Sequence, residues 1–350
     1  MIPFRQTQLP TTVSESRMQA VYEHIKTPIK HGAVMKLENM LTDSPSVFRR
    51  GDRFYMYFIS ISKETGSSGY ETHLAESGDL LNWTYRGTVL RRNTLENWDS
   101  KQCAGYAAYM DIDFDGSYEL EKIDGCYRIS YLAGNSDGYE PDPLYMGLTR
   151  STDPTDLDAF ERLPEPILRP EDPDARPFET RTLYKSFLFR DAAEVTGYPY
   201  VNIYNAKGKD GRERIFLAVS DDGENFERYG DRAVLDRIAS DPGTLITGDP
   251  QIIRMEDLYV MLFFRYNEGS GAFNTFACSY DLVNWTLWDG QPLIEPDEPW
   301  DNVHAHKPWF VRYNGVNYHF YCAVNDREER FIALAHSDTG SAQSKLGGEA

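Results

Sequence analysis

The segment "SYDLVNW" at residues 279–285 closely repeats "SGDLLNW" at residues 77–83. In both, a Ser, an Asp two residues later and a Trp follow a short strand-like run. Self-similarity at long spacing is typical of repeat architectures. Three more strand-like runs end in a Ser, which makes five copies in all. The five serines are Ser77, Ser151, Ser220, Ser279 and Ser337.

Each serine-ended strand has further expected strands around it. Aromatic-rich strands lie directly upstream, at 52–60, 125–134, 197–206, 257–265 and 315–324. Innermost strands lie upstream of those, at 44–50, 107–114, 183–191, 249–255 and 306–313. Outer strands follow the first four serines, at 87–91, 165–170, 232–236 and 291–296. Five units of four antiparallel strands predict an all-β, five-bladed β-propeller.

The fifth unit has no outer strand after Ser337, but the N-terminal region supplies a candidate. "HGAVMKL" at 31–37 resembles the outer-strand segment "RGTVLRR" at 86–92. We therefore expect the N-terminal strand to complete the fifth blade. Such pairing closes the ring and removes exposed sheet edges.

The chain is expected to form one large domain with short additions at both ends. The segment 13–25 has the pattern of a short helix, with Ser14 or Ser16 as its cap. The prediction is an N-terminal extension with this helix at 1–30, a propeller catalytic domain at 31–338 and a disordered tail at 339–350.

The net charge of −19 at pH 7 narrows the classes of partner. Basic residues cluster only in pairs such as Arg49-Arg50, so we expect neither nucleic acid nor a membrane surface as a partner. The four cysteines form no CxxC pair, which disfavours a zinc site. The first residues lack a basic-then-apolar signal pattern. This predicts a cytoplasmic protein, unless a leader has already been removed.

Polar residues occur where the innermost strands of the predicted propeller begin. Buried strands usually begin with apolar or turn residues, and these starts crowd around one mouth of the central channel. The residues are Asp43, Asp111 with Asp113, Tyr184 with Lys185, Asp249, and His306 with Lys307. Hydrolysis of a glycosidic bond needs one protonated carboxyl group for the leaving oxygen and one ionised group that activates water or attacks. The pattern therefore predicts a glycosidase site.

Loops near the same mouth add candidates. "GYE" occurs twice, so that Glu71 and Glu140 both precede a third strand, while Trp98 and Trp300 would offer a stacking floor for a sugar ring. The catalytic candidates are Asp43, Asp249, Asp111 and Glu140. The substrate-binding candidates are Trp98, Trp300, Tyr184, Lys185, His306 and Glu71. Each has a structural alternative: an Asp as a turn residue, a Glu at a surface strand start, and a Trp or His in the core.

The Asp before the first innermost strand, the repeated S-x-D-L-x-x-W segment and the acidic start of a later blade resemble the five-bladed glycoside hydrolases of families 43, 32 and 117, and the related family 130 phosphorylases. The resemblance covers about 31–337 and implies Asp43 as base or nucleophile. Asp249 stands where family 43 would show a Glu, so Asp249, Glu140 or Glu71 would be the acid. His306 stands where family 43 often holds a central histidine, which implies a Ca²⁺ or Na⁺ site. The opening segment of family 32 is absent, so fructan cleavage is not expected.

Three functions follow from these residues. The first is an exo-acting, inverting glycosidase for an oligosaccharide or glycoside, with no required cofactor. The second is a glycoside phosphorylase that uses cations such as Lys185, Arg181, Lys307 and Arg265 for phosphate. The third is a non-catalytic carbohydrate-binding propeller, which an Asp43 side chain fully paired with an arginine would favour.

Overall fold

The computed structural model describes residues 1–63, 68–236 and 241–337, so the tail expected at 339–350 lies outside the described residues. Within these ranges the chain forms one helix, α1 (Glu15–Ile25), and 20 strands. No helix among them has the length and apolar character that crossing a bilayer requires. The fold is therefore all-β, as the sequence predicts.

The described strands fall into five antiparallel groups of four. The first group is β2 (Met40–Arg50), β3 (Arg53–Ser62), β4 (Glu71–Ser77) and β5 (Trp83–Leu90). The second is β6 (Gln102–Ala107), β7 (Ile129–Gly134), β8 (Tyr145–Arg150) and β9 (Glu161–Arg162). The third is β10 (Thr182–Arg190), β11 (Tyr200–Lys207), β12 (Glu213–Ser220) and β13 (Glu227–Tyr229). The fourth is β14 (Thr244–Met255), β15 (Leu258–Asn267), β16 (Gly271–Ser279) and β17 (Thr286–Leu287). The fifth is β18 (His304–Tyr313), β19 (Val316–Val324), β20 (Arg330–His336) and β1 (Ile29–Met35).

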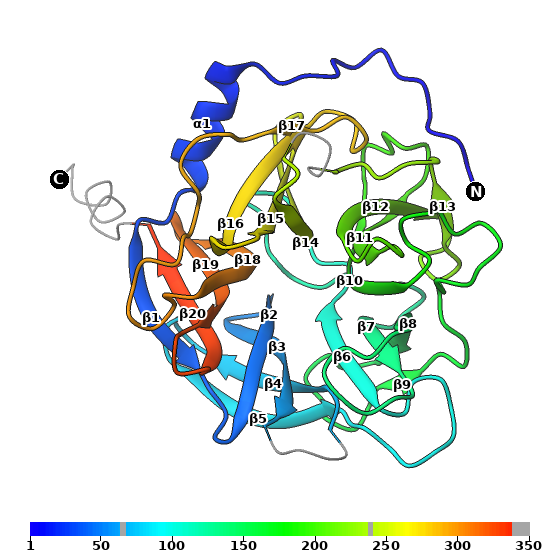
Figure 1. The fold of residues 1–350 in the computed structure, drawn as a ribbon, viewed down its shortest axis with the longest axis vertical. Helices are drawn as coiled ribbons and strands as arrows, with labels where there is room; N and C mark the ends of the chain where they lie inside the picture. The colour runs from blue at the N-terminus through cyan, green and yellow to red at the C-terminus, as the bar shows by residue number, and fades with distance from the viewer. Residues whose placement is uncertain (64–67, 237–240, 338–350) are drawn as a thin grey trace.

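The hydrogen-bonded sheets are larger than these groups. The first two groups are separate four-stranded sheets, and the other three join into one twelve-stranded sheet. One parallel residue pair makes each junction: Glu213 with Ile246, and Ala272 with His304. The groups stand like sectors around a common centre, with β2, β6, β10, β14 and β18 nearest the middle (Figure 1). The first residues of several strands thereby reach one central space.

The N-terminal strand closes the ring, as expected. β1 pairs antiparallel with β20, and the paired residues run from Ile29 opposite His336 to Met35 opposite Ile332. α1 precedes β1, and the Ser14 side chain caps it by accepting a hydrogen bond from the Arg17 amide. The helix buries Met18, Val21 and Ile25 against the outer part of the fourth group, so it is held by apolar packing on one face.

The repeated Ser-x-Asp segment is a turn that ends the third strand of a group. Ser77 Oγ accepts hydrogen bonds from the Asp79 and Leu80 amides, and Asp79 accepts from Leu81 and Asn82. The following Trp83 donates its indole N–H to the Leu80 carbonyl. In the second copy, Ser279 Oγ accepts from the Asp281 amide, Asp281 accepts from the Val283 and Asn284 amides, and the Trp285 indole donates to the Leu282 carbonyl. These residues are structural.

Four of the five innermost strands have an irregularity at the same level. Register shifts fall between Asp43 and Ser46, Leu183 and Ser186, Gly248 and Gln251, and His306 and Trp309. Ser44, Asp249 and Lys307 have positive φ values of 45°, 53° and 57°. A bulge of this kind turns side chains out of the regular alternation of a strand. The polar residues of these segments can therefore face the centre.

The second innermost strand differs from the prediction. The expected strand at 107–114 is wrong, because β6 ends at Ala107 and the chain then turns, with Tyr109 at a φ of 58°. Residues 103–110 form one continuous buried run in which nothing in the sequence marks the strand end. Asp111 consequently follows the innermost strand and does not begin it.

We expect the Lys30 side chain to contribute strongly to the stability of the fold, because it belongs to the strand that closes the ring. Its Nζ lies 2.6 Å from Oδ2 of the fully buried Asp301, which also accepts a hydrogen bond from the Tyr321 hydroxyl. Lys30→Met removes the cation and leaves a buried carboxylate without it, so the free energy of unfolding should fall by about 3–5 kcal/mol. Urea denaturation measures this loss.

Lys36→Met is the matched control, because Lys36 follows the same strand and pairs with Glu329 at the surface. An exposed pair contributes about 0–1 kcal/mol. Equal losses in the two variants would contradict the assignment.

Candidate active site

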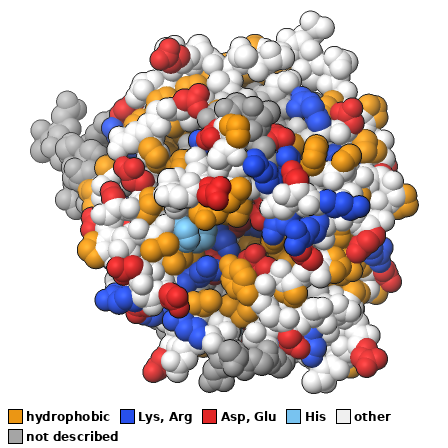
Figure 2. Space-filling view, viewed as in Figure 1, with side chains coloured by type: hydrophobic (Ala, Val, Ile, Leu, Met, Phe, Trp, Pro, Cys, Tyr) orange, Lys and Arg blue, Asp and Glu red, His pale blue; other side chains and the backbone are white. Residues whose placement is uncertain are grey.

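A cavity of about 180 Å³ opens at the centre of the ring. Figure 2 shows the face on which it opens, with a histidine and basic side chains beside the central hollow. Apolar and aromatic residues such as Ile59, Tyr106, Tyr184 and Phe264 form part of its wall. The cavity therefore combines apolar contact surface with charged groups, as ligand sites commonly do.

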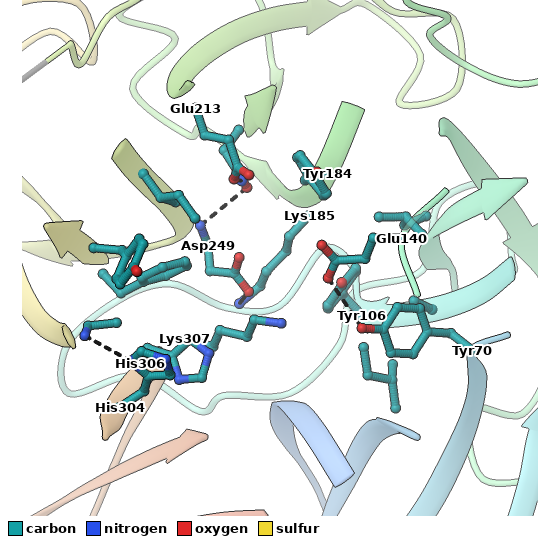
Figure 3. Close-up of a pocket in the computed structure, with 18 of the residues that line it drawn as sticks. Tyr70, Tyr106, Glu140, Tyr184, Lys185, Glu213, Asp249, His304, His306 and Lys307 are labelled. Carbon is teal, nitrogen blue, oxygen red and sulfur yellow. Dashed lines mark hydrogen bonds and ion pairs between the residues drawn. The ribbon is translucent and has the colours of Figure 1, made fainter. Parts of the chain in front are cut away.

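Three carboxylates line the cavity, and each comes from a different group of strands. Glu140 is in the loop between β7 and β8, Glu213 begins β12, and Asp249 is in the bulge of β14. The carboxylates of Glu140 and Asp249 and the amines of Lys185 and Lys307 point toward one space (Figure 3). This convergence is what general acid–base chemistry on a bound molecule requires.

Glu213 has the environment of a proton donor. Its Oε2 accepts a hydrogen bond of 2.8 Å from the Asn205 amide, and its Oε1 lies 3.5 Å from Lys207 Nζ. Burial raises the pKa of Glu213 to about 7; Lys207 opposes the shift, and the charges of Glu140 and Asp249 add to it. A carboxyl group with a pKa near neutrality can hold its proton and still release it.

Glu140 lies at the mouth and is partly exposed. Its Oε1 accepts a hydrogen bond of 3.2 Å from the buried Tyr70 hydroxyl. Burial holds the pKa of Tyr70 well above its usual value, so this hydroxyl remains a donor. Tyr70 therefore orients the Glu140 carboxylate toward the cavity.

Asp249 and Lys185 face each other as a long ion pair with no hydrogen bond between them. Asp249 Oδ2 and Lys185 Nζ are 3.9 Å apart, and both atoms are buried without a hydrogen-bond partner. Burial raises the pKa of Asp249, although Lys185 opposes the shift. Burial also lowers the pKa of Lys185 to about 8. Each group is thus pushed toward its neutral form, and each has an unused polar atom.

Asp43 is fully buried beside the cavity and is not among the residues that line it. Its Oδ2 accepts hydrogen bonds of 2.8 Å from both Lys307 and Arg330, and its Oδ1 accepts one from the Ser44 amide. Burial alone would raise the pKa of Asp43, but the two cations hold it well below its usual value. This is the arginine pairing that was expected of a non-catalytic Asp43.

The cavity brings together half of the candidates from the sequence. The five that line it are Asp249, Glu140, Tyr184, Lys185 and His306. The five that do not are Asp43, Asp111, Glu71, Trp98 and Trp300. The first set sits in bulges or in the loop before a third strand. In the second set, Asp43 is paired with cations beside the cavity, and the other four residues bond or pack elsewhere in the fold.

Asp111 and Glu71 serve the backbone. The Asp111 carboxylate accepts hydrogen bonds from the Ser117 amide and hydroxyl, so it closes a turn that follows β6. Glu71 begins β4 and accepts a hydrogen bond from the Arg92 amide. Neither carboxylate lines the cavity.

Both tryptophans pack against other side chains and do not line the cavity. Trp98 stacks on Tyr131 with ring centroids 5.9 Å apart and donates to the Pro164 carbonyl. Trp300 packs on the cluster of buried residues in the fifth group and donates to the Tyr321 hydroxyl. Their indole groups are thus occupied within the fold.

A Ca²⁺ or Na⁺ ion beside His306 stays a prediction. His306 Nδ1 lies 3.0 Å from the Cys322 carbonyl oxygen, and burial holds the pKa of His306 well below its usual value. Within 1–63, 68–236 and 241–337, no group of three or more His, Cys, Asp or Glu side chains is arranged to hold a metal. Asp43, the carboxylate whose charge acts on His306, already has two cationic partners. The residues around His306 are therefore a poor fit for a cation.

Glu213 and Arg330 belong to the site, although the sequence reasoning missed them. Each begins the third strand of its group, as Glu71 does in the first. That position had already drawn attention to Glu71 and Glu140. The same criterion, applied to "GRERIFLAVS" and "REERFIALAH", would have found both residues.

Comparison with known proteins gives the class. A solved "Glycoside hydrolase" is 40% identical, with a TM-score of 0.88, and the match covers 93% of this chain and 96% of that one. A solved complex of BT0996 with RGII is also 40% identical, with a TM-score of 0.88, and the match covers 94% of this chain and 97% of that one. The chain therefore belongs to the glycoside hydrolases.

More distant structures share the fold alone. A thermostable family-43 glycoside hydrolase is 15% identical, with a TM-score of 0.62 over 90% of this chain and 94% of that one. No protein-family model matches the chain, and no curated protein matches it. The similar structures include members of families 43, 117 and 130. They confirm the resemblance to this set of hydrolases, but they do not assign the chain to one of the families.

Asp43 and Asp249 should differ in their effect on stability. Folding lowers the pKa of Asp43. The ionised Asp43 carboxylate therefore stabilises the fold at pH values above its unfolded pKa. This stabilisation is lost as the pH falls through the lower pKa of the folded state. Asp43→Asn leaves the buried Lys307 and the partly buried Arg330 without their carboxylate and should cost about 3–5 kcal/mol at pH 7. Asp249 is held toward its neutral form, so Asp249→Asn should change the free energy of unfolding by at most about 1 kcal/mol.

Denaturant unfolding of both variants at pH 7 measures the difference. The two substitutions are the same chemical change in neighbouring buried positions, so each controls for the other. A larger loss for Asp249→Asn would contradict the account of the charges.

Proposed function

We propose that this chain is an exo-acting, inverting glycoside hydrolase in which Glu213 is the general acid and Glu140 the general base. The five strand groups are the blades of a five-bladed propeller, and the central cavity holds the terminal sugar. The observation that carries the proposal is the Glu213 carboxyl, which is buried in the cavity and has a pKa of about 7.

The chemistry follows from the two carboxyl groups. Glu213 donates its proton to the glycosidic oxygen as the bond from that oxygen to the anomeric carbon breaks. Glu140 takes a proton from a water molecule whose oxygen forms the new bond to the same carbon. The products are a free sugar and the shortened saccharide, and exchange of protons with solvent restores both groups.

Glu140 is a better base than Asp43, the residue that the resemblance implies. A base must reach the attacking water, and Asp43 does not line the cavity. Its lowered pKa also makes it a weak acceptor of protons. Asp43 instead holds Lys307 and Arg330 in place, and both of these line the cavity. It is a positioning residue.

The size of the cavity supports exo action. About 180 Å³ is below the range of roughly 300–1,000 Å³ typical of pockets for larger ligands, and suits one sugar residue. A wider groove of about 640 Å³ shares Tyr139, His304 and Arg330 with the cavity. The remainder of the saccharide would lie there.

Inversion is supported by the placement of the two glutamates. They come from different blades, and both line the cavity. An inverting enzyme needs room for a water molecule between the sugar and the base. Separate blades allow that room.

The phosphorylase alternative has less support. Of the four cations suggested for phosphate, Lys307 pairs with Asp43, Arg181 with Asp142 and Arg265 with Asp241. Lys185 alone of these faces the cavity with an unbonded Nζ. Lys307 and Arg330 share Asp43, and Lys185 faces Asp249, so each cation that lines the cavity already has a carboxylate partner, which makes a poor phosphate site.

A non-catalytic propeller is favoured only by the pairing of Asp43. Glu140 and Glu213 remain in the cavity and face the space where a sugar would bind. The 40% identical glycoside hydrolase, and the relative solved as a complex with RGII, support a saccharide as substrate and a role in polysaccharide degradation.

Glu213→Gln should lower kcat/KM by about 10²–10⁴-fold on substrates with poor leaving groups, because the amide cannot donate a proton. In the wild type, kcat/KM should fall as the pH rises through about 7, where Glu213 loses its proton. That alkaline limb should be absent from the variant. A screen of furanosides and pyranosides finds the substrate, and pH profiles measure both effects.

Glu71→Gln is the matched control, because Glu71 holds the same strand position but does not line the cavity. It should keep activity within about twofold, as expected of a distant surface change. Full activity in Glu213→Gln would contradict the assignment of the acid.

The first-formed product should be the inverted anomer, because a single displacement by water occurs on the opposite face of the ring. Proton NMR during early turnover identifies the anomer. Added inorganic phosphate should neither raise the rate nor give a sugar phosphate. A phosphate-dependent product would show a phosphorylase, and a retained anomer would show that one glutamate is a nucleophile.

A further inference from the structure

Two buried polar atoms of residues that line the cavity have no hydrogen-bond partner among the described residues, although they form a long ion pair with each other. Lys185 Nζ and Asp249 Oδ2 are each inaccessible and form no hydrogen bond. A buried polar atom left unbonded costs about 1–3 kcal/mol. Such an atom in a native fold calls for an explanation, and a bound ligand is one.

The distance between the two atoms indicates what that ligand carries. At 3.9 Å they are too far apart for a hydrogen bond, which needs about 2.7–3.2 Å. A hydroxyl group accepts one hydrogen bond and donates another. Hydroxyl groups near this gap would accept from Lys185 and donate to Asp249.

The surrounding charges decide against a charged ligand. Three carboxylates and three cations line the cavity: Glu140, Glu213 and Asp249, and Lys185, Lys307 and Arg330. Lys307 and Arg330 are already paired with Asp43. An anionic sugar would therefore meet three carboxyl groups, and each cation of the cavity already faces a carboxylate of the protein: Asp43 for Lys307 and Arg330, and Asp249 for Lys185.

The walls suit the apolar edges of a sugar ring. Tyr106 and Tyr184 line the cavity beside Lys185, whose Nζ lies 5.5 Å from the Tyr106 ring centroid. The Tyr184 hydroxyl accepts a hydrogen bond from Lys207, which fixes its ring. C–H groups of a ring can pack against such surfaces while hydroxyl groups reach the polar atoms.

We infer that Lys185 and Asp249 bind adjacent free hydroxyl groups of a neutral, terminal sugar residue. The inference rests on the proposed function, which it deepens by naming the substrate class. Uronic acids and sugars deoxygenated at the bound position are disfavoured. Lys185 and Asp249 contact the substrate and select it, while Glu213 and Glu140 carry out the reaction.

Binding to the Glu213→Gln protein tests the inference without turnover. Calorimetry would use neutral pentoses and hexoses, their deoxy analogues, hexuronates and inorganic phosphate as probes. We expect a neutral sugar to bind, and one of its deoxy analogues to bind about tenfold or more weakly. Adding Lys185→Met or Asp249→Asn to this protein should weaken its affinity for the neutral sugar by a similar factor. Either change should also remove most of the difference in affinity between the neutral sugar and its deoxy analogue.

Lys36→Met in the same background is the control and should leave sugar affinity unchanged, because Lys36 is at the surface. Asp249→Asn conserves size, so it tests the inference even where Lys185→Met unfolds. Tighter binding of a hexuronate or of phosphate than of every neutral sugar would overturn the inference. Unchanged affinity in Asp249→Asn, or no binding of any neutral sugar, would also overturn it.

The two proposals fail separately. A wild-type protein that binds neutral sugars as expected but hydrolyses no glycoside would refute the proposed function and leave the sugar class standing. A wild-type protein that hydrolyses only uronosides would refute the sugar class and leave the hydrolase standing.

Discussion

The bulges in four innermost strands are the constraint on which the centre of the molecule depends. Side chains of a regular strand alternate between two faces, and here both faces are covered by neighbouring groups. Polar residues reach the axis because the alternation is interrupted at Asp43, Lys185, Asp249 and Lys307. Left-handed backbone at non-glycine residues costs about 1–2 kcal/mol each. Dense apolar packing around the ring offsets that cost and keeps the site rigid.

Burial of charge then divides the central residues into two sets. Lys307 and Arg330 donate hydrogen bonds to Asp43, and the three residues form a fixed cluster beside the cavity. Glu213, Asp249 and Lys185 are less completely paired, and burial moves the pKa of each toward its neutral form. A carboxyl group that stays protonated near neutrality can act as an acid, and an unbonded pair can bind a ligand. One physical effect, desolvation, thus produces both parts of the proposed site.

The sequence predicted the strand groups and the closing strand, and half of its candidate residues line the cavity, because these are properties of short repeated segments. Lys185, Asp249 and His306 were found because bulge residues lie at the start of innermost strands. Asp111 was misplaced because the buried run at 103–110 has no mark of where β6 ends. The pairing of Asp43 with Arg330 could not be predicted, since 287 positions separate them. Glu213 could have been found, since it begins a third strand as Glu71 does.

The most direct test is a crystal structure of the Glu213→Gln protein with a saccharide that the wild type hydrolyses. The account predicts a terminal sugar ring in the central cavity, with the glycosidic oxygen within hydrogen-bond distance of the residue 213 side chain. It also predicts a water molecule, or space for one, between the anomeric carbon and Glu140. A ring bound outside the cavity, or a glycosidic oxygen that faces Asp43 or Asp249, would contradict it.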